Sequence, residues 1–178
     1  MRVCVALSFL MLSASAPAFA QDPAPAVVPG QVRALEGCWQ GEGLVMGKPV
    51  AIALTARPIT EGVMFLVEAQ SHAKFDPSDR YAAHLIFGGW GAPPKTGEAV
   101  AISGFWIDSF GGDFTAPGVG SAVADGFDVA YAYPDATFIN RWRRTPEHLS
   151  WTIVAKTGSA PEAAFARYDL KRISCVAK

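Results

Sequence analysis

The stretch LEGCWQGEGLVMGKPVAIALTAR, residues 35–57, holds two short apolar runs on either side of a tight turn. The runs cover 38–46 and 49–57, and Gly47-Lys48 lies between them. Apolar runs of this length that are bounded by glycine and proline are typical of β-strands. So short a link places two strands side by side in opposite directions. The stretch therefore predicts an antiparallel hairpin.

The same pattern continues along the chain. Runs rich in Val, Ile, Phe, Trp and Tyr alternate with turn sequences, and no window shows a clean helical stripe. Asp125-Gly126 is a strong two-residue hairpin signal, and Pro77-Ser78-Asp79 is expected to close a longer loop after residue 70. The expected strands are 38–46, 49–57, 62–70, 81–90, 99–108, 113–123, 126–133, 136–144, 148–157 and 163–173.

Short links between successive strands predict a meander, in which each strand pairs with the next along the chain. About ten strands are more than a flat, twisted sheet tolerates, so the sheet is expected to close on itself. We therefore predict an all-β fold, an antiparallel up-and-down β-barrel of about ten strands. It should form a single domain over residues 34–175.

Composition narrows the function classes. The chain has 178 residues, of which 51% are hydrophobic and 17% are charged, and this excludes intrinsic disorder. Its 15 Lys and Arg are matched by 16 Asp and Glu, and the formal net charge is -1. Domains that bind nucleic acid carry a basic excess, so no nucleic-acid partner is expected.

The N-terminus has the features of a secretory signal peptide over residues 1–20. A basic Arg2 precedes the apolar segment 3–12, and Ala18-Phe19-Ala20 fits a cleavage site. Ten apolar residues are too few to span a bilayer as a helix, so the chain is not expected to be membrane-spanning in that way. The predicted location is the periplasm or the exterior, after cleavage near Ala20. Residues 21–33, rich in Pro and Ala, are expected to form a flexible leader.

The predicted export determines which cysteines remain in the mature chain and whether they are expected to be oxidised. Cys4 leaves with the signal peptide, which keeps Cys38 and Cys175 in the mature chain. An even pair in an oxidising compartment favours a disulfide, and two free buried thiols are the alternative. No His-rich or Cys-rich spacing accompanies the pair, so no metal site is expected.

Three segments carry a resemblance to a known group of barrels. The segment 35–43, with its Gly-x-Trp, resembles the opening strand of the calycin superfamily, which includes lipocalins, fatty-acid-binding proteins and nitrobindin-like haem proteins. GFWIDS at 104–109 and the ending with Tyr168 and Arg172 are similar to a bacterial, periplasmic calycin-like family. The resemblance covers roughly 35–174.

This resemblance implies a structural role for Trp39 and Arg172. In calycins an Arg of the last strand packs over the Trp of the first, because a guanidinium stacks on an indole face. Trp39 and Arg172 are the matching positions. If both point inward, alternation along the strands sends Cys38 and Cys175 to the outside, where the two sulfurs can meet.

The same resemblance implies a small hydrophobic ligand, lipid-like or haem-like, held in the lumen without catalysis. Trp106, Trp142 and His84 are the candidate ligand-binding residues. Trp106 belongs to the shared motif. Trp142 is expected inside because alternation sends Arg141 and Arg143 to water. Haem is a possible cofactor, with His84 or His148 as the iron ligand.

Other functions stay open at this stage. An outer-membrane β-barrel shares the export signal and the strand count, although strand alternation places Arg141 and Arg143 on the outer face. An isomerase or cyclase that acts on a bound apolar molecule is a further alternative, but no nucleophile elbow and no spaced carboxylate pair support an enzyme. The basic run 141–144 has two interpretations: capture of an anion, or a solvated strand face.

The signal sequence gives a direct prediction. Protein exported from cells should begin near Gln21, because Ala18-Phe19-Ala20 is the expected cleavage site. N-terminal sequencing of the exported material tests this, and exported protein that retains Met1 would contradict it.

Overall fold

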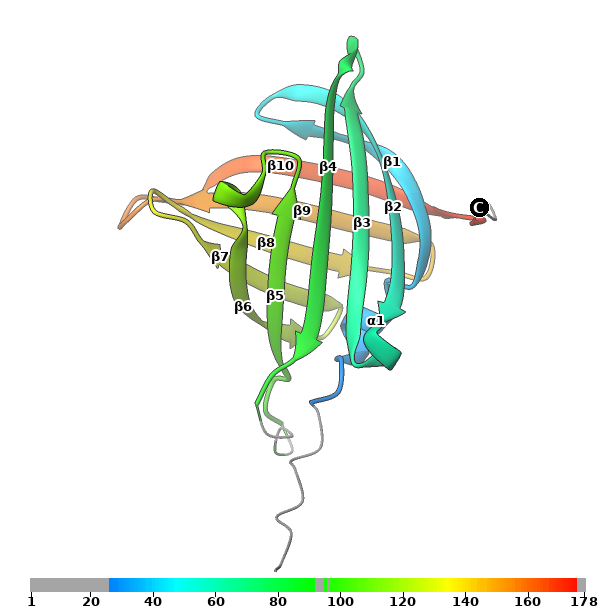
Figure 1. Ribbon diagram of the computed structural model, residues 1–178, viewed down its shortest axis with the longest axis vertical. Helices are drawn as coiled ribbons and strands as arrows, with labels where there is room; N and C mark the ends of the chain where they lie inside the picture. Colours follow the sequence, from blue (N-terminus) through cyan, green and yellow to red (C-terminus); the bar gives the residue numbers. More distant parts are fainter. Residues whose placement is uncertain (1–25, 92–94, 96, 176–178) are drawn as a thin grey trace, which may run out of the picture.

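The structure is a closed, ten-stranded antiparallel barrel, described by a computed structural model for residues 26–91, 95 and 97–175 (Figure 1). All ten expected strands are present, and the up-and-down β-barrel is confirmed. Two short 3₁₀ helices, η1 and η2, and one short α-helix accompany them. The elements are α1 (Gly30–Arg33), β1 (Gly37–Val45), β2 (Lys48–Ile59), η1 (Thr60–Gly62), β3 (Met64–Ala73), β4 (Asp76–Gly89), β5 (Ala101–Asp108), η2 (Gly112–Phe114), β6 (Ala116–Val123), β7 (Gly126–Ala132), β8 (Thr137–Arg144), β9 (His148–Lys156) and β10 (Ala163–Ile173).

Closure comes from one pairing between strands that are far apart in sequence. Every other neighbour in the barrel is also the next strand along the chain, whereas β1 pairs with β10. Their antiparallel register runs from Cys38 opposite Ile173 to Val45 opposite Ala166. No strand is left as an open edge in this order, so the sheet offers no free row of backbone groups for further pairing.

The interior is filled by aromatic side chains at one level of the barrel. Phe127, Trp142, Trp151 and Tyr168 lie opposite one another on β7, β8, β9 and β10. Their rings stack in sequence, with centroids 5.8, 4.4 and 4.9 Å apart. Alternation explains the row, because each of these residues occupies an inward position of its strand.

Helix α1 covers one end of the barrel, and this corrects the expected leader over 21–33. Val28 and Val32 are buried in the core, and the backbone of Val27 lies so close to Gly89 of β4 that a side chain at Gly89 would clash with it. Val28 and Val32 pack against the hydrophobic core at that end, and the free energy gained by their burial outweighs the tendency of a Pro-rich segment to stay extended. The barrel domain therefore begins before residue 34. Residues 21–25 and the signal peptide predicted over 1–20 lie outside the described residues.

The loop expected after residue 70 is instead part of a long hairpin. β3 and β4 extend to a tight turn at Lys74-Phe75, and the register shifts between His72 and Ala73. Asp76 anchors the start of β4 by accepting hydrogen bonds from the backbone N–H and the hydroxyl of Ser78. Pro77-Ser78-Asp79 therefore lies within β4, and its turn-forming residues reflect the local hydrogen bonds of Asp76 rather than a loop. Figure 1 shows the hairpin reaching beyond its neighbours.

The seam between the first and last strands is held by stacking and by hydrogen bonds. The guanidinium carbon of Arg172 lies 4.3 Å from the centre of the Trp39 ring. Arg172 Nη1 donates to the carbonyl of Glu36 at 2.7 Å, and Trp39 Nε1 donates to the carbonyl of Leu35 at 2.8 Å. Trp39 is fully buried. The structure thus places these two residues together, as the resemblance implies.

A disulfide between Cys38 and Cys175 ties the same seam, as expected. The Cα atoms lie 5.2 Å apart, and the bond joins residues separated by 137 positions. In the described residues, no helix has the length and apolar character needed to cross a membrane.

Replacing both Cys38 and Cys175 by Ala should lower the free energy of unfolding by about 4–5 kcal/mol, because the bond closes a loop of almost the whole domain in the unfolded chain. Chemical denaturation of oxidised wild type and of the double variant measures the difference. Titration of two free thiols in denatured, unreduced protein would contradict the disulfide.

Candidate functional site

The end of the barrel opposite α1 exposes part of its interior. Five inward-facing residues there are only half-buried, and we call them the mouth: Tyr81, Asp108, Tyr133, Phe138 and Phe165. The rings of Tyr133, Phe138 and Phe165 meet edge to face, with centroids 5.5 and 5.0 Å apart. This end is therefore aromatic, with a single carboxylate among the rings.

A chain of hydrogen bonds runs from the interior to that carboxylate. Trp106 Nε1 donates to the hydroxyl oxygen of Tyr81 at 2.9 Å, and this hydroxyl donates to Asp108 Oδ2 at 3.1 Å. Asp108 Oδ1 accepts from the backbone N–H of Phe110 at 2.9 Å. Burial, and then the negative charge of Asp108, raise the pKa of Tyr81. Tyr81 is consequently a neutral donor committed to Asp108.

Tyr131, unlike Tyr81, is buried deeper in the barrel and does not take part in this chain of hydrogen bonds. Its side chain is fully buried, and its hydroxyl has no hydrogen-bond partner among the residues that the structure describes. A Cβ at Gly104 would fall 2.7 Å from this hydroxyl, and one at Gly118 would fall 2.7 Å from the ring. Both glycines are therefore required for Tyr131 to lie along the inner wall beside Trp106. Burial raises the pKa of Tyr131, so the hydroxyl is neutral.

Two further buried donors lie on β8. Asn140 is completely buried, and its Oδ1 accepts a hydrogen bond from Trp151 Nε1 at 2.7 Å, while its Nδ2 has no partner. The indole Nε1 of Trp142 also has none. Including Arg144 Nε, all four unpaired buried side-chain atoms found in the described part of the chain carry a hydrogen to donate.

The sequence-predicted lining residues divide into two groups. Trp106 and Trp142 lie in the interior, where they are 5% and 0% exposed. The prediction that His84 reaches the lumen is wrong, because its side chain is 58% exposed and faces Glu68 on the outside. Its neighbours Ala83 and Leu85 occupy the inward positions of β4, so alternation forces His84 outward.

The histidine positions also decide the haem hypothesis. His72 and His148 are exposed on the outer side, like His84. A haem in the lumen with a histidine ligand therefore does not fit this chain. The described residues also contain no cluster of three or more His, Cys, Asp or Glu side chains placed to hold a metal ion.

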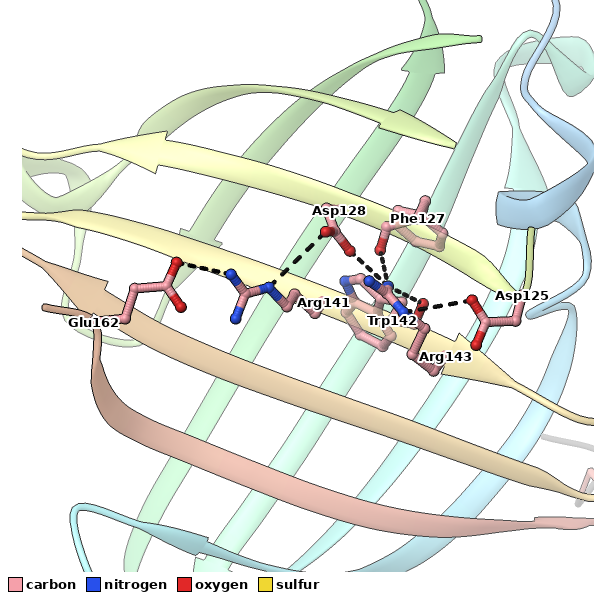
Figure 2. A network of polar contacts seen from close by, with 7 residues as sticks. All are labelled: Asp125, Phe127, Asp128, Arg141, Trp142, Arg143 and Glu162. Carbon is pink, nitrogen blue, oxygen red and sulfur yellow. Dashed lines mark hydrogen bonds and ion pairs between the residues drawn. The ribbon is translucent and has the colours of Figure 1, made fainter. Parts of the chain in front are cut away.

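Arg141 and Arg143 of the basic run on β8 belong to a charge-matched network on the outer face (Figure 2). Arg141 pairs with Glu162 at 2.8 Å and with Asp128 at 3.9 Å. Arg143 pairs with Asp125 and Asp128 and also donates to backbone carbonyls. Since carboxylates already neutralise both guanidinium groups, the network matches the solvated-face interpretation rather than anion capture.

Sequence reasoning missed Tyr81, Tyr131 and Asn140 as site residues. Alternation alone places each of them on the inner face. The sequence does not show whether an inward polar group is hydrogen-bonded within the protein, and only this distinguishes a candidate site residue from an ordinary core residue. The sequence signal for this site is Gly104, the first residue of the GFWIDS motif, together with Gly118, its partner on the neighbouring strand; both are small residues at inward positions.

Comparison of the sequence with models of known families and with curated proteins gives no match. The closed barrel is compatible with a calycin-like fold, and this likeness rests on architecture and on the residues of the seam.

The buried tyrosines predict how stability depends on alkaline pH. Burial raises the pKa of Tyr168 from 10.0 to about 12. The unfolded chain therefore loses this proton first, and folding stability should fall as the pH rises from 10.0 to about 12. Tyr168→Phe should make this fall smaller.

Denaturant unfolding of wild type and Tyr168→Phe over this pH range measures the effect. Below pH 10.0 the tyrosine is neutral in both states, so the difference between the two proteins should be constant there. Equal slopes above pH 10.0 would show that Tyr168 does not contribute.

Proposed function

We propose that this barrel binds a small, flat, largely apolar molecule in its interior, admits it through the mouth, and performs no chemistry on it. Stacked indole and phenol rings favour a flat apolar ligand. Trp106 and Trp142 are the proposed lining residues.

The observation that carries the proposal is the hydroxyl of Tyr131. A buried polar group without a partner costs about 1–3 kcal/mol, so phenylalanine would serve packing better at this position. Gly104 and Gly118 nevertheless leave the space that the tyrosine needs. A hydrogen-bond partner from a bound molecule accounts for a cost that packing within the protein does not explain.

The unpaired groups also suggest the polarity of the ligand. Tyr131, Asn140 and Trp142 each offer a hydrogen, and none of their unpaired atoms is an acceptor only. The complement is an acceptor oxygen on an otherwise apolar molecule, such as a carbonyl or a carboxylate.

The alternatives agree less well with the side-chain pattern. An outer-membrane barrel has an apolar outer band and a polar lumen, whereas here the stacked row of aromatic rings faces inward and the paired Arg141 and Arg143 face outward. Catalysis by Tyr81 as a base is disfavoured because its pKa is raised and its proton is held by Asp108. The disulfide supports the proposed export to an oxidising compartment.

Binding of a matched probe pair tests the proposal. Anthracene-9-carboxylate carries the expected acceptor oxygens on a flat apolar ring, and anthracene lacks them. The carboxylate should quench the tryptophan fluorescence of wild type at lower concentration. Tyr131→Phe removes one oxygen only, and it should weaken carboxylate binding by about tenfold without lowering the free energy of unfolding.

Trp90→Phe is the control variant, because Trp90 is 60% exposed at the α1 end and should leave binding unchanged. Native mass spectrometry of protein purified from its own host should also show a retained small molecule. Absence of quenching by either probe, together with a ligand-free mass spectrum, would refute binding in the interior.

A further inference from the structure

Three large apolar side chains stand exposed at the hairpin tips around the mouth, and we call them the rim: Met46, Phe75 and Phe110. Their exposed fractions are 76, 88 and 70%. Met46 lies between β1 and β2, Phe75 between β3 and β4, and Phe110 between β5 and β6. In an up-and-down barrel these connections all lie at one end, and Figure 1 shows the three turns on the side away from α1.

Turn chemistry does not account for these residues. Met46 adopts a positive φ of 48°, followed by Gly47 at 81°, so the hairpin has the backbone of a turn that favours Asn-Gly. Methionine is strained there, and it buries nothing in exchange. Phe75 occupies the two-residue turn of its hairpin, where polar residues are usual. The fold would be served equally well or better by polar residues at both tips.

We propose that the rim docks on the surface of a zwitterionic lipid bilayer. Each apolar side chain is carried on a separate connection, between a different pair of strands. A fluid surface accepts such separated side chains independently, and methionine and phenylalanine both partition into the boundary of the hydrocarbon region.

The charges at the tips favour a neutral surface over an anionic one. In segments 46–48, 74–80 and 109–115 the cations Lys48, Lys74 and Arg80 are equalled in number by Asp76, Asp79 and Asp113. Lys48 is also paired with Asp79 at 2.8 Å, and Lys74 is paired with Glu42. Attraction to anionic lipid requires an uncompensated basic cluster, which these segments lack.

Docking by the rim would bring the mouth to the lipid. The ring of Phe110 lies 5.8 Å from that of Tyr81, a mouth residue, so the rim and the mouth are in contact. A molecule dissolved in the bilayer would then meet the aromatic entrance without crossing water. Docking itself needs no ligand, so its test is separate from that of binding in the interior.

Flotation of the purified protein with phosphatidylcholine vesicles tests the proposal. Wild type should float with the vesicles, equally well when phosphatidylserine is added and equally well in high salt. The double variant Met46→Asn, Phe75→Asn should bind at least about tenfold more weakly, because two apolar side chains no longer enter the lipid. Met46→Asn suits the turn, so this variant should keep the wild-type unfolding curve.

Trp90→Asn removes an exposed aromatic side chain at the opposite end and should bind vesicles like wild type. The proposal is overturned if wild type fails to float, if the double variant floats as well as wild type, or if salt abolishes binding. Analytical ultracentrifugation tests the alternative that the rim binds a second copy of the chain. That alternative would replace membrane docking if wild type does not float but forms a dimer, and if the double variant does not form this dimer.

Discussion

The pairing of β1 with β10 is the contact on which the other features depend. It turns a meander of hairpins into a ring, and only a ring gives the inward side chains a common interior. Stacking of Arg172 on Trp39 and the bond between Cys38 and Cys175 both act on this seam. Loss of the seam would open the ring and expose the edges of two strands along with the aromatic row.

Different strands contribute side chains of different size to that interior. β7 to β10 contribute the stacked row of rings, and glycines on β5 and β6 make room for Tyr131 of β7. The wall is therefore asymmetric, with its polar donors on the strands that carry the rings. The two ends of the lumen also differ, because α1 covers one of them and the mouth lies at the other.

The sequence predicted the barrel because its signals are local. Alternation and turn residues fix strand positions, and hairpins such as that at Asp125-Gly126 fix the neighbours. The predictions from sequence were wrong or incomplete where the position of a residue depends on residues far away in the chain. Val28 and Val32 are buried only because the barrel offers an uncovered end, and the partners of Tyr81 and Tyr131 come from other strands. The outward position of His84 could have been predicted from alternation within β4, because Ala83 and Leu85 take the inward positions.

Both ends of the described chain leave the barrel on the side of α1. The first described residues cross that end beneath β4, and the disulfide holds residue 175 beside the start of β1. A tag, fusion partner or surface linkage joined directly to residue 26 or to residue 175 therefore orients the molecule with its opposite face outward. Immobilised copies would present one uniform aspect to the solution, and a single attachment chemistry would serve for measurements on the free face.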